Sequence, residues 1–584
     1  MTVEAVVIGD FQNGDSDTIR NLGGFWIQEE DTDIDNNPAT SEGIFVYEGV
    51  MKKDVVLGDK VKVTGSVKRY NGRTQITAAT VSIVASLGES GLPSRATVLL
   101  DETGQSNPNL EAYDGMLVVF RQKLTITDMY NLDRYNTIRL VAGDRPYQYT
   151  QLNRPSASGN EEYLLRFNNR VITYDDGLTT KYNNIAFLDG FGPEYTTASA
   201  PRLGDYTNDL QGVLTYSFGS WRVISVKNGT NHFTVGNPRP LKPTEIHGKM
   251  KVASYNVMNF FTTLDEKGNT AGPSNLEPRG ANNRAELDRQ IQKLVTNIVT
   301  LDADILGLLE LENNFIGGDP GNALELLVDS VNAALGSGVT YAYVYPGVDY
   351  IDSSDAISVG IMYKVGKVKL VGSPAILHDD PLTETVFDGA ATSRPPLAVT
   401  FAKKGLFTLP LGCITIAVNH FKSKDCGGAK GLDQDQGDGA GCFNHRRLMS
   451  AKAVVNWLKK DPTQSYCPHT AIVGDLNSYA MEDPVRYLTD EAGYVSVENS
   501  TAYSYVFDGQ IGTLDYIFLS RSLVEVGIFK GSNVWHINED EANALDYNLD
   551  FGRLPSYFDG TNPARSSDHS PIVAGLKWGW LDGI

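Results

Sequence analysis

Long apolar runs and an excess of positive charge are both missing from this sequence of 584 residues. No run reaches the ~18 apolar residues that a membrane-spanning helix needs, so we expect no membrane contact. Lys and Arg number 50 against 71 Asp and Glu, a net charge of −21. This balance excludes a protein that grips a polyanion by bulk positive charge alone. The hydrophobic share of 41% excludes a wholly disordered chain.

Cysteine is absent from the first two thirds of the chain, and all four cysteines lie close together: Cys413, Cys426, Cys442 and Cys467. An even, clustered set favours two disulfides, for which three pairings exist, with a zinc site or free buried thiols as alternatives. The chain starts without the basic and apolar segments of a signal peptide. We expect a secreted protein whose signal peptide is absent from this sequence, with a cytoplasmic protein as the alternative. Disulfides, acidity and 28 tyrosines favour export.

The chain begins with short apolar runs that alternate with polar residues, a pattern typical of half-buried strands. An Asn-Gly turn at 71–72 links two of these runs. We expect an OB-fold-like β-barrel over 1–93 and a second β-rich, OB-like domain over 94–240, with a loop-rich stretch at 145–205.

After a proline-containing linker at 236–249, the pattern changes. Helical spacing at 284–301, 324–335 and 448–458 now alternates with apolar strands. Strands and helices mixed in this way predict a layered α/β domain over 248–584.

Polar side chains recur where the apolar strands of this α/β domain begin or end. One acid after a strand is usually a cap or turn residue, but a set at six strand ends is hard to explain in that way. Because strand ends at one sheet edge cluster in space, we expect a single polar pocket. Its members are Asn256, Glu310, His420, Asp475 with Asn477, Asp515, and Asp568 with His569.

The motifs around these positions resemble the endonuclease/exonuclease/phosphatase family, which includes deoxyribonuclease I and the AP endonucleases. The β-rich region in front resembles the bacterial extracellular nucleases of this family that carry a YhcR-type OB region. The motifs, in family order, are Ser-Tyr-Asn-Val-Met-Asn-Phe (254–260), Ala-Asp-Ile-Leu-Gly-Leu-Leu-Glu (303–310), Asn-His-Phe-Lys-Ser (419–423), Gly-Asp-Leu-Asn (474–477), Leu-Asp-Tyr-Ile-Phe (514–518) and Ser-Asp-His-Ser-Pro (567–571).

The resemblance implies a four-layered α/β sandwich and metal-dependent hydrolysis of phosphodiesters. Glu310 corresponds to the principal ligand of Mg²⁺ or Mn²⁺, assisted by Asn256 and Asp568. Glu312 is a second candidate for this ligand, since alternation along a strand would put it on the same face as Glu310.

The resemblance also assigns the proton-transfer groups. Asp475 would orient or deprotonate the attacking water, with Asn477 holding the geometry. His569 would pair with Asp515, and His420 would donate to the phosphate or to the leaving oxygen. No carboxylate that would support His420 can be placed from the sequence.

Arg394 corresponds to the phosphate-contacting arginine of the family, a task that suits a guanidinium fork. A surface ion pair is its alternative role.

The cysteines can be paired through the motifs. Cys413 lies seven residues before His420, and Cys467 eight residues before Asp475. If the two strands are parallel neighbours, these cysteines meet at the opposite sheet edge. We therefore favour Cys413–Cys467, with Cys426–Cys442 closing the loop between them.

A candidate calcium site lies in the N-terminal part, where the residues match the ligand spacing of an EF-hand loop. No helices flank it, and Asn stands where an EF-hand has Gly, so a solvated acidic hairpin is the alternative. A structural Ca²⁺ is thus a second candidate cofactor, held by Asp31, Asp33, Asp35, Asn37 and Glu42.

Together these patterns predict a secreted, divalent-metal-dependent nuclease for DNA, or for RNA, with low sequence specificity. We expect a monomer without an obligate protein partner. The barrels would help to hold the substrate, with hairpin residues Lys68, Arg69, Tyr70 and Arg73 as candidates. The alternatives are a phosphoesterase of the same family acting on a phospholipid head group or a nucleotide, and a non-catalytic nucleic-acid-binding protein.

Overall fold

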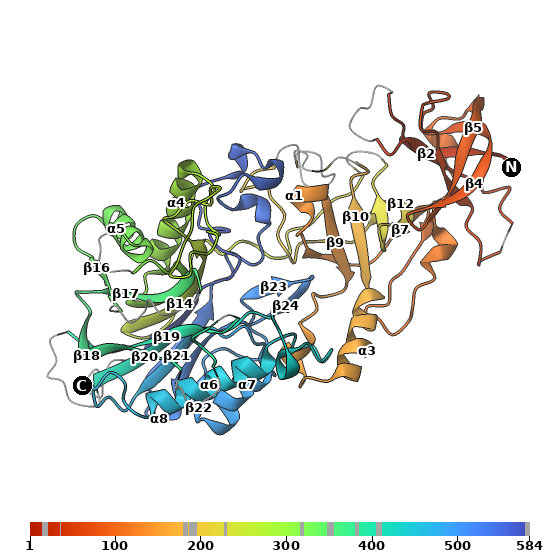
Figure 1. Ribbon diagram of the computed structural model, residues 1–584. Helices are drawn as coiled ribbons and strands as arrows, with labels where there is room; N and C mark the ends of the chain where they lie inside the picture. Colours follow the sequence, from red (N-terminus) through yellow and green to blue (C-terminus); the bar gives the residue numbers. More distant parts are fainter. Residues whose placement is uncertain are drawn as a thin grey trace.

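The chain forms three successive parts, a barrel, a middle sheet and a sandwich (Figure 1). No helix in the described part of the chain is long and apolar enough to cross a membrane. The computed structural model describes residues 1–14, 21–35, 37–178, 181, 185, 195–226, 230–315, 321–346, 355–379, 385–389, 391–404 and 412–577.

The first part is a closed five-stranded barrel. Its strand order is β1-β2-β3-β5-β4, with β1 antiparallel to both β2 and β4, and β3 parallel to β5. In β4, Val61 and Val63 point into the core of the barrel, whereas Lys62 and Thr64 are exposed. This alternation follows from the two-residue period of side chains along a strand. The closed barrel agrees with the OB-like architecture expected here. Its strands are β1 Thr2–Phe11, β2 Gly24–Gln28, β3 Gly43–Tyr47, β4 Asp59–Tyr70 and β5 Arg73–Ser86.

The second part, residues 94–240, is called the middle region below. It forms one eight-stranded sheet, open at β11 and β6, in the order β11-β8-β9-β10-β13-β12-β7-β6. Its strands are β6 Ala96–Thr97, β7 Leu117–Phe120, β8 Leu124–Asp128, β9 Thr137–Ala142, β10 Val171–Asp175, β11 Tyr206–Thr207, β12 Leu210–Ser217 and β13 Ser220–Ile224.

The stretch expected to be loop-rich within the middle region contains regular structure. Helix α3 (Ala157–Asn168) is capped by the Ser156 side chain, which accepts a hydrogen bond from the Gly159 amide. Only Phe167 of this helix is buried, so the apolar spacing that would reveal a helix in the sequence is missing. Two short helices also lie in the middle region, α1 (Leu132–Tyr135) and α2 (Tyr149–Leu152).

The third part contains two six-stranded sheets. The first has the order β16-β17-β15-β14-β27-β26 and the second β18-β19-β20-β21-β25-β22. The strands of the first are β14 Met250–Phe260, β15 Ile305–Glu312, β16 Tyr341–Tyr343, β17 Ile357–Lys364, β26 Phe529–Val534 and β27 Ile572–Leu576. Those of the second are β18 Val368–Ile376, β19 Arg394–Lys403, β20 Cys413–His420, β21 Thr470–Asp475, β22 Tyr494–Ser496 and β25 Asp515–Ser520.

The side chains of these sheets define four layers. In β20, Ile416 and Val418 enter the core shared with the first sheet, whereas Ala417 between them packs in a second core with residues of α6. Figure 1 shows α4 and α5 outside the first sheet and α6 and α7 outside the second. The expected four-layered α/β sandwich is confirmed. Its helices are α4 Arg284–Leu301, α5 Ala323–Leu335, α6 Asn444–Leu458, α7 Asp483–Arg486 and α8 Arg521–Glu525.

Two disulfides join the segments around the second sheet. Cys413 pairs with Cys467 at a Cα–Cα distance of 5.9 Å, and Cys426 pairs with Cys442 at 5.2 Å. Strands β20 and β21 are parallel neighbours, with Thr415 beside Thr470. This register is the reason that Cys413 and Cys467 meet, as the sequence analysis assumed.

Removing the second disulfide with Cys426→Ser/Cys442→Ser is expected to lower the free energy of unfolding by about 3 kcal/mol, because a loop of this size loses its constraint in the unfolded chain. Equilibrium unfolding in denaturant measures the change. An unchanged midpoint would show that the cross-link does not stabilise the fold.

Candidate active site

Four of the expected residues form one row across the second sheet. Strand β20 runs parallel to β21 and places His420 beside Asp475. Strand β25 runs antiparallel to β21 and places Asp515 beside Asp475, while β19 places Arg394 beside His420. Register partners on neighbouring strands point to the same face of a sheet. The register therefore gathers a guanidinium, an imidazole and two carboxylates at one place.

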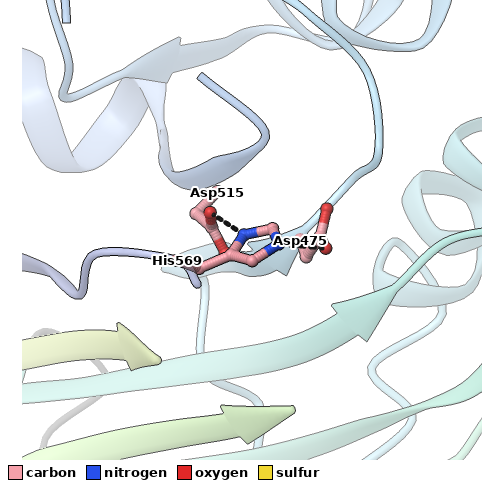
Figure 2. A group of neighbouring side chains, drawn as sticks. All are labelled: Asp475, Asp515 and His569. Atoms are coloured by element: carbon pink, nitrogen blue, oxygen red, sulfur yellow. Dashed lines mark hydrogen bonds and ion pairs between the residues drawn. The ribbon is translucent and has the colours of Figure 1, made fainter. Parts of the chain in front are cut away.

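His569 meets this row from the segment before β27. Figure 2 shows the hydrogen bond between the His569 ring and Asp515. Nδ1 of His569 lies 2.7 Å from Oδ2 of Asp515, and that oxygen also accepts a hydrogen bond of 2.7 Å from the Ser504 hydroxyl. The ring stacks on Tyr505 with centroids 4.5 Å apart. Burial lowers the pKa of His569, but the carboxylates of Asp515 and Asp568 outweigh it and hold the pKa well above its usual value.

Asp475 lies between the two histidines. Its Oδ2 is 4.0 Å from Nε2 of His569 and 3.7 Å from Nε2 of His420. Its Oδ1 accepts a hydrogen bond of 2.7 Å from the amide of Asn477, whose side chain donates to the Phe421 carbonyl. Burial, with the negative charge of Asp515, raises the pKa of Asp475 to about 7, although His569 opposes the shift. A carboxyl with this pKa can accept a proton near neutral pH.

Glu310 occupies a β-bulge opposite this row. The pairing of β15 with β17 skips Glu310, and its φ of 64° lies in the left-handed region, which is rare outside glycine. Its Oε1 accepts a hydrogen bond of 3.0 Å from the side chain of Asn256, and its Oε2 accepts one of 2.9 Å from the amide of Asn259. Oε1 lies 4.0 Å from Nε2 of His420, so the first sheet contributes Glu310 to the same site.

The bulge gives Glu312 a different role. The Glu312 carboxylate accepts hydrogen bonds from the backbone amides and hydroxyls of Thr262 and Thr263, and from the side chain of Asn314. It is buried and fully engaged in holding this loop. Glu312 therefore stabilises the segment after β14, and only Glu310 faces the row of acids and histidines.

A divalent cation fits the surroundings of Glu310. Burial and the negative charge of Asp568 raise the pKa of Glu310, and a bound cation would offset this charge. Oxygen donors of this kind suit Mg²⁺ or Mn²⁺. Asn256 turns its amide group to Glu310 and its oxygen to the amide of Met258, so it orients Glu310.

Asp475, Asp515 and His569 also bring three donor atoms within 4.8 Å of one another. This group is less suited to a metal, because Nδ1 of His569 is already hydrogen-bonded to Asp515 and the pKa of the imidazole is raised. A protonated imidazole repels a cation and supplies the positive charge itself.

His420 has an unusual environment. Its Nδ1 is buried and has no hydrogen-bond partner among the described residues. From the sequence, no supporting carboxylate for His420 could be placed. Burial, together with the positive charges of Arg394 and His569, lowers the pKa of His420 well below its usual value. The imidazole is therefore neutral at pH 7.

Arg394 is buried and paired. Its Nε donates to Asp355 at 2.8 Å and one terminal nitrogen donates to the Phe421 carbonyl at 3.2 Å. Arg279 binds the other oxygen of Asp355 at 2.8 Å. The ion pair that was the alternative role of Arg394 therefore exists, but it is buried and does not lie on the surface.

Sequence reasoning missed several residues of this site. Lys422 belongs to a recognised motif and its charge acts on His420, so the motif could have identified it. Ser504 and Tyr505 lie ten or more residues before Asp515 in no motif, and Asp355 precedes β17. Only the folded chain shows that they contact Asp515, His569 and Arg394.

The residues of the candidate calcium site lie between β2 and β3, and Asn36 falls outside the described residues. The Asp31 carboxylate accepts hydrogen bonds from the amide and hydroxyl of Ser94, and Asp35 accepts one from the amide of Asn37. No group of three metal donors forms among the described residues of this loop. The calcium site stays a prediction, which also includes Asp33 and Glu42.

The fold and the site define a hydrolase of phosphoesters built on an α/β sandwich. A sequence model of the Endonuclease/Exonuclease/phosphatase family matches residues 253–569. The chain belongs to this family of hydrolytic phosphodiesterases and phosphatases, whose enzymes typically use divalent metals.

Solved structures resemble the chain over 56% of its length at low identity. The catalytic domain of human Nocturnin is 15% identical, with 93% of that domain covered and a TM-score of 0.32. A mannosyl-6-phosphatase of Bacteroides thetaiotaomicron is 15% identical, with 99% covered and a TM-score of 0.33. TDP2 of D. rerio, solved with a single-strand DNA product, is 15% identical, with 97% covered and a TM-score of 0.32. Among curated proteins no match is found.

The two glutamates of β15 form a matched pair for a test. Glu310→Gln is expected to raise the Mg²⁺ concentration needed for half-maximal phosphodiesterase activity, because a carboxylate near the cation is lost. Glu312→Gln is expected to lower the free energy of unfolding by about 2 kcal/mol and to leave the Mg²⁺ requirement unchanged, because its contacts are hydrogen bonds within the loop. Metal titration and thermal unfolding of both variants separate the roles; a reversed pattern contradicts them.

Proposed function

We propose that this protein is a secreted, divalent-metal-dependent nuclease that hydrolyses phosphodiester bonds of DNA, and of RNA as a second substrate, with low sequence specificity. One observation carries the proposal: Asp475 Oδ2 lies 3.7 Å from Nε2 of His420 and 4.0 Å from Nε2 of His569, while Glu310 Oε1 lies 4.0 Å from Nε2 of His420. The pKa of Asp475, raised to about 7 by burial and Asp515, suits a base at this place. This arrangement combines a base, positive charge and a metal-binding carboxylate around one point. The proposed domains are 1–93, 94–240 and the catalytic domain 248–584.

Each group has a defined task in the proposed reaction. Glu310 and Asp568 would hold Mg²⁺ or Mn²⁺, with Asn256 orienting Glu310 beside the ion. The ion would supply positive charge next to the phosphate oxygens. Asp475, held by the amide of Asn477, accepts the proton of the attacking water. The imidazolium of His569, kept in place by Asp515, stabilises the negative charge that develops on the phosphate.

The basic residues beside His420 form the phosphate-binding side. Arg394 and Lys422 both act on His420, and Arg279 joins Arg394 through Asp355. His420, neutral and buried, donates a hydrogen bond from Nε2 to the phosphate or to the leaving oxygen. This local positive group offsets the net charge of −21 that would repel a polyanion.

The proton-transfer roles are tested on a small diester, bis(p-nitrophenyl) phosphate, and on DNA. Asp475→Asn and His569→Ala are each expected to lower kcat by about 100-fold or more. His378→Ala is the control, since His378 forms a similar pair with Asp388 outside the site and is expected to keep activity. Addition of EDTA should abolish hydrolysis. Near wild-type activity of His569→Ala would falsify the mechanism.

An exposed aromatic ring beside the site favours nucleic acid as the substrate. Strand β23 (Tyr505–Phe507) pairs with β24 (Gln510–Gly512) in a hairpin. Alternation places Tyr505 and Phe507 on one face, while Val506 packs on the core of the middle region. Tyr505 stacks on His569, and Phe507 is 62% exposed at about 7 Å along the strand. A nucleobase next to the cleaved phosphate can stack on Phe507.

The same hairpin disfavours the phospholipid alternative. Its tip is tied to the middle region, because Asp508 pairs with Arg139 and the Gly509 carbonyl accepts a hydrogen bond from Thr127. A hairpin held in this way cannot insert its tip into a membrane.

In the barrel, Arg73 was one of the residues expected to help hold the substrate. Its guanidinium lies over the ring of Phe45 at 3.8 Å, so it acts there as a packing residue.

Phe507→Ala is expected to raise KM for single-stranded DNA about 10-fold, since stacking of one base is worth ~1–3 kcal/mol. Hydrolysis of bis(p-nitrophenyl) phosphate should not change. Phe218→Ala is the matched control, because Phe218 is 74% exposed in the middle region. Equal effects on both substrates would contradict base stacking. Parallel assays with phospholipid vesicles and nucleotide monoesters test the alternative substrates, and closed circular against linear DNA tests for internal cutting.

A further inference from the structure

The β23–β24 hairpin, which contacts Asp515 and His569 through Ser504 and Tyr505, is held by residues outside the sandwich. Residues 146–151 of the middle region lie along the segment 500–513, which contains β23 and β24; Figure 1 shows this hairpin between the sandwich and strands β9 and β10. The Gln148 amide donates to the Ile511 carbonyl at 2.8 Å, and the Ile511 amide donates to the Pro146 carbonyl at 2.9 Å. The middle region therefore joins the hairpin through one parallel β-bridge, between Tyr147 and Ile511.

Gln151 is the central residue of this contact. Its side chain is only 1% exposed. Its amide nitrogen lies 3.3 Å from the Ser500 carbonyl and 3.4 Å from the Ala502 carbonyl, and donates to both. Its oxygen accepts a hydrogen bond of 3.0 Å from the Thr513 amide. One side chain thus joins both ends of the hairpin.

The same oxygen of Gln151 also reaches the loop that follows β21. The Ala480 amide donates to it at 3.4 Å, three residues after Asn477. Thr150 supports this contact, because its carbonyl accepts a hydrogen bond from the Met481 amide and its hydroxyl donates to Glu482. Gln151 is therefore linked to the segment carrying Asp475 as well as to the hairpin.

The hairpin in turn sets the Asp515–His569 pair. The Ser504 hydroxyl donates to Asp515, and the Ser504 carbonyl accepts a hydrogen bond of 3.0 Å from the Ser570 amide, next to His569. Tyr505 covers one face of the His569 ring. A shift of the hairpin would move both partners of the pair at once.

We propose that Gln151 is a positioning residue of the hydrolytic site, through which the middle region fixes the relative placement of Asp475 and the Asp515–His569 pair. The proposal rests on the proposed function, and it makes the middle region a part of the catalytic unit. Gln151 itself touches neither substrate nor metal. Its effect falls on kcat, since small displacements of acid–base groups cost rate more than binding.

The test compares two glutamines of the middle region in the full-length protein. Gln151→Met keeps the size of the side chain and removes all four hydrogen bonds. Gln122→Met is the matched control, because Gln122 also uses both ends of its amide, with the amide and carbonyl of Leu100, inside the middle region. Steady-state kinetics on bis(p-nitrophenyl) phosphate give kcat and KM. The downfield proton resonance of the His569–Asp515 hydrogen bond, assigned by its loss in His569→Ala, reports the geometry without an activity assay.

Gln151→Met is expected to lower kcat by about 10- to 100-fold with KM changed less than about two-fold, and to broaden or shift the resonance. Gln122→Met is expected to change neither. The proposal is overturned by wild-type kcat in Gln151→Met, by an equal loss in Gln122→Met, or by a loss of kcat with an unchanged resonance.

If Gln151→Met does not fold, Gln151→Glu decides, because it keeps the oxygen for Thr513 and Ala480 and loses the donor. Its kcat should then fall while the protein stays folded, and an unchanged kcat and resonance would overturn the proposal. If the wild-type protein hydrolyses no phosphodiester, the proposed function fails, and the resonance comparison still decides the positioning role.

Discussion

The site depends on the buried hydrogen bond between Asp515 and His569. Without that carboxylate, burial would remove the charge from the imidazole, as it does at His420. With it, His569 keeps a positive charge beside Asp475. The two histidines of the site therefore differ in charge, because carboxylates surround His569 whereas the positive charges of Arg394 and His569 add to the burial of His420. The charge of His569 also opposes the upward shift that burial and Asp515 impose on the pKa of Asp475.

This pair requires support from three directions. The register of β21 and β25 sets Asp515, the segment before β27 brings His569, and the β23–β24 hairpin contacts both. The middle region holds that hairpin through residues 146–151. The polar contacts continue behind the site, where Arg145 and Arg202 pair with the buried Asp540. The middle region thus packs against the hairpin that contacts Asp515 and His569.

The sequence allowed much of the sandwich to be predicted, because its strands are apolar, its helices have clear apolar spacing, and its motifs end the strands. Spacing alone could not separate Glu310 from Glu312, although the family resemblance favoured Glu310, since the bulge that separates them is a feature of strand pairing. Helix α3 was missed because it buries a single side chain. Ser504, Tyr505 and Gln151 were missed because they act through contacts between segments that are distant in the chain.

The sequence by itself determined the succession of most strands and helices along the chain in the sandwich and the residue types at the strand ends, because local patterning and motifs are encoded in neighbouring residues. The pairing of Cys413 with Cys467 followed once the two strands were taken as parallel. Only the tertiary structure decided the charge states of the histidines, the environment of Asp475 and the contact of the middle region with the hairpin. These properties depend on burial and on distances of a few ångströms between remote segments, which no local pattern specifies.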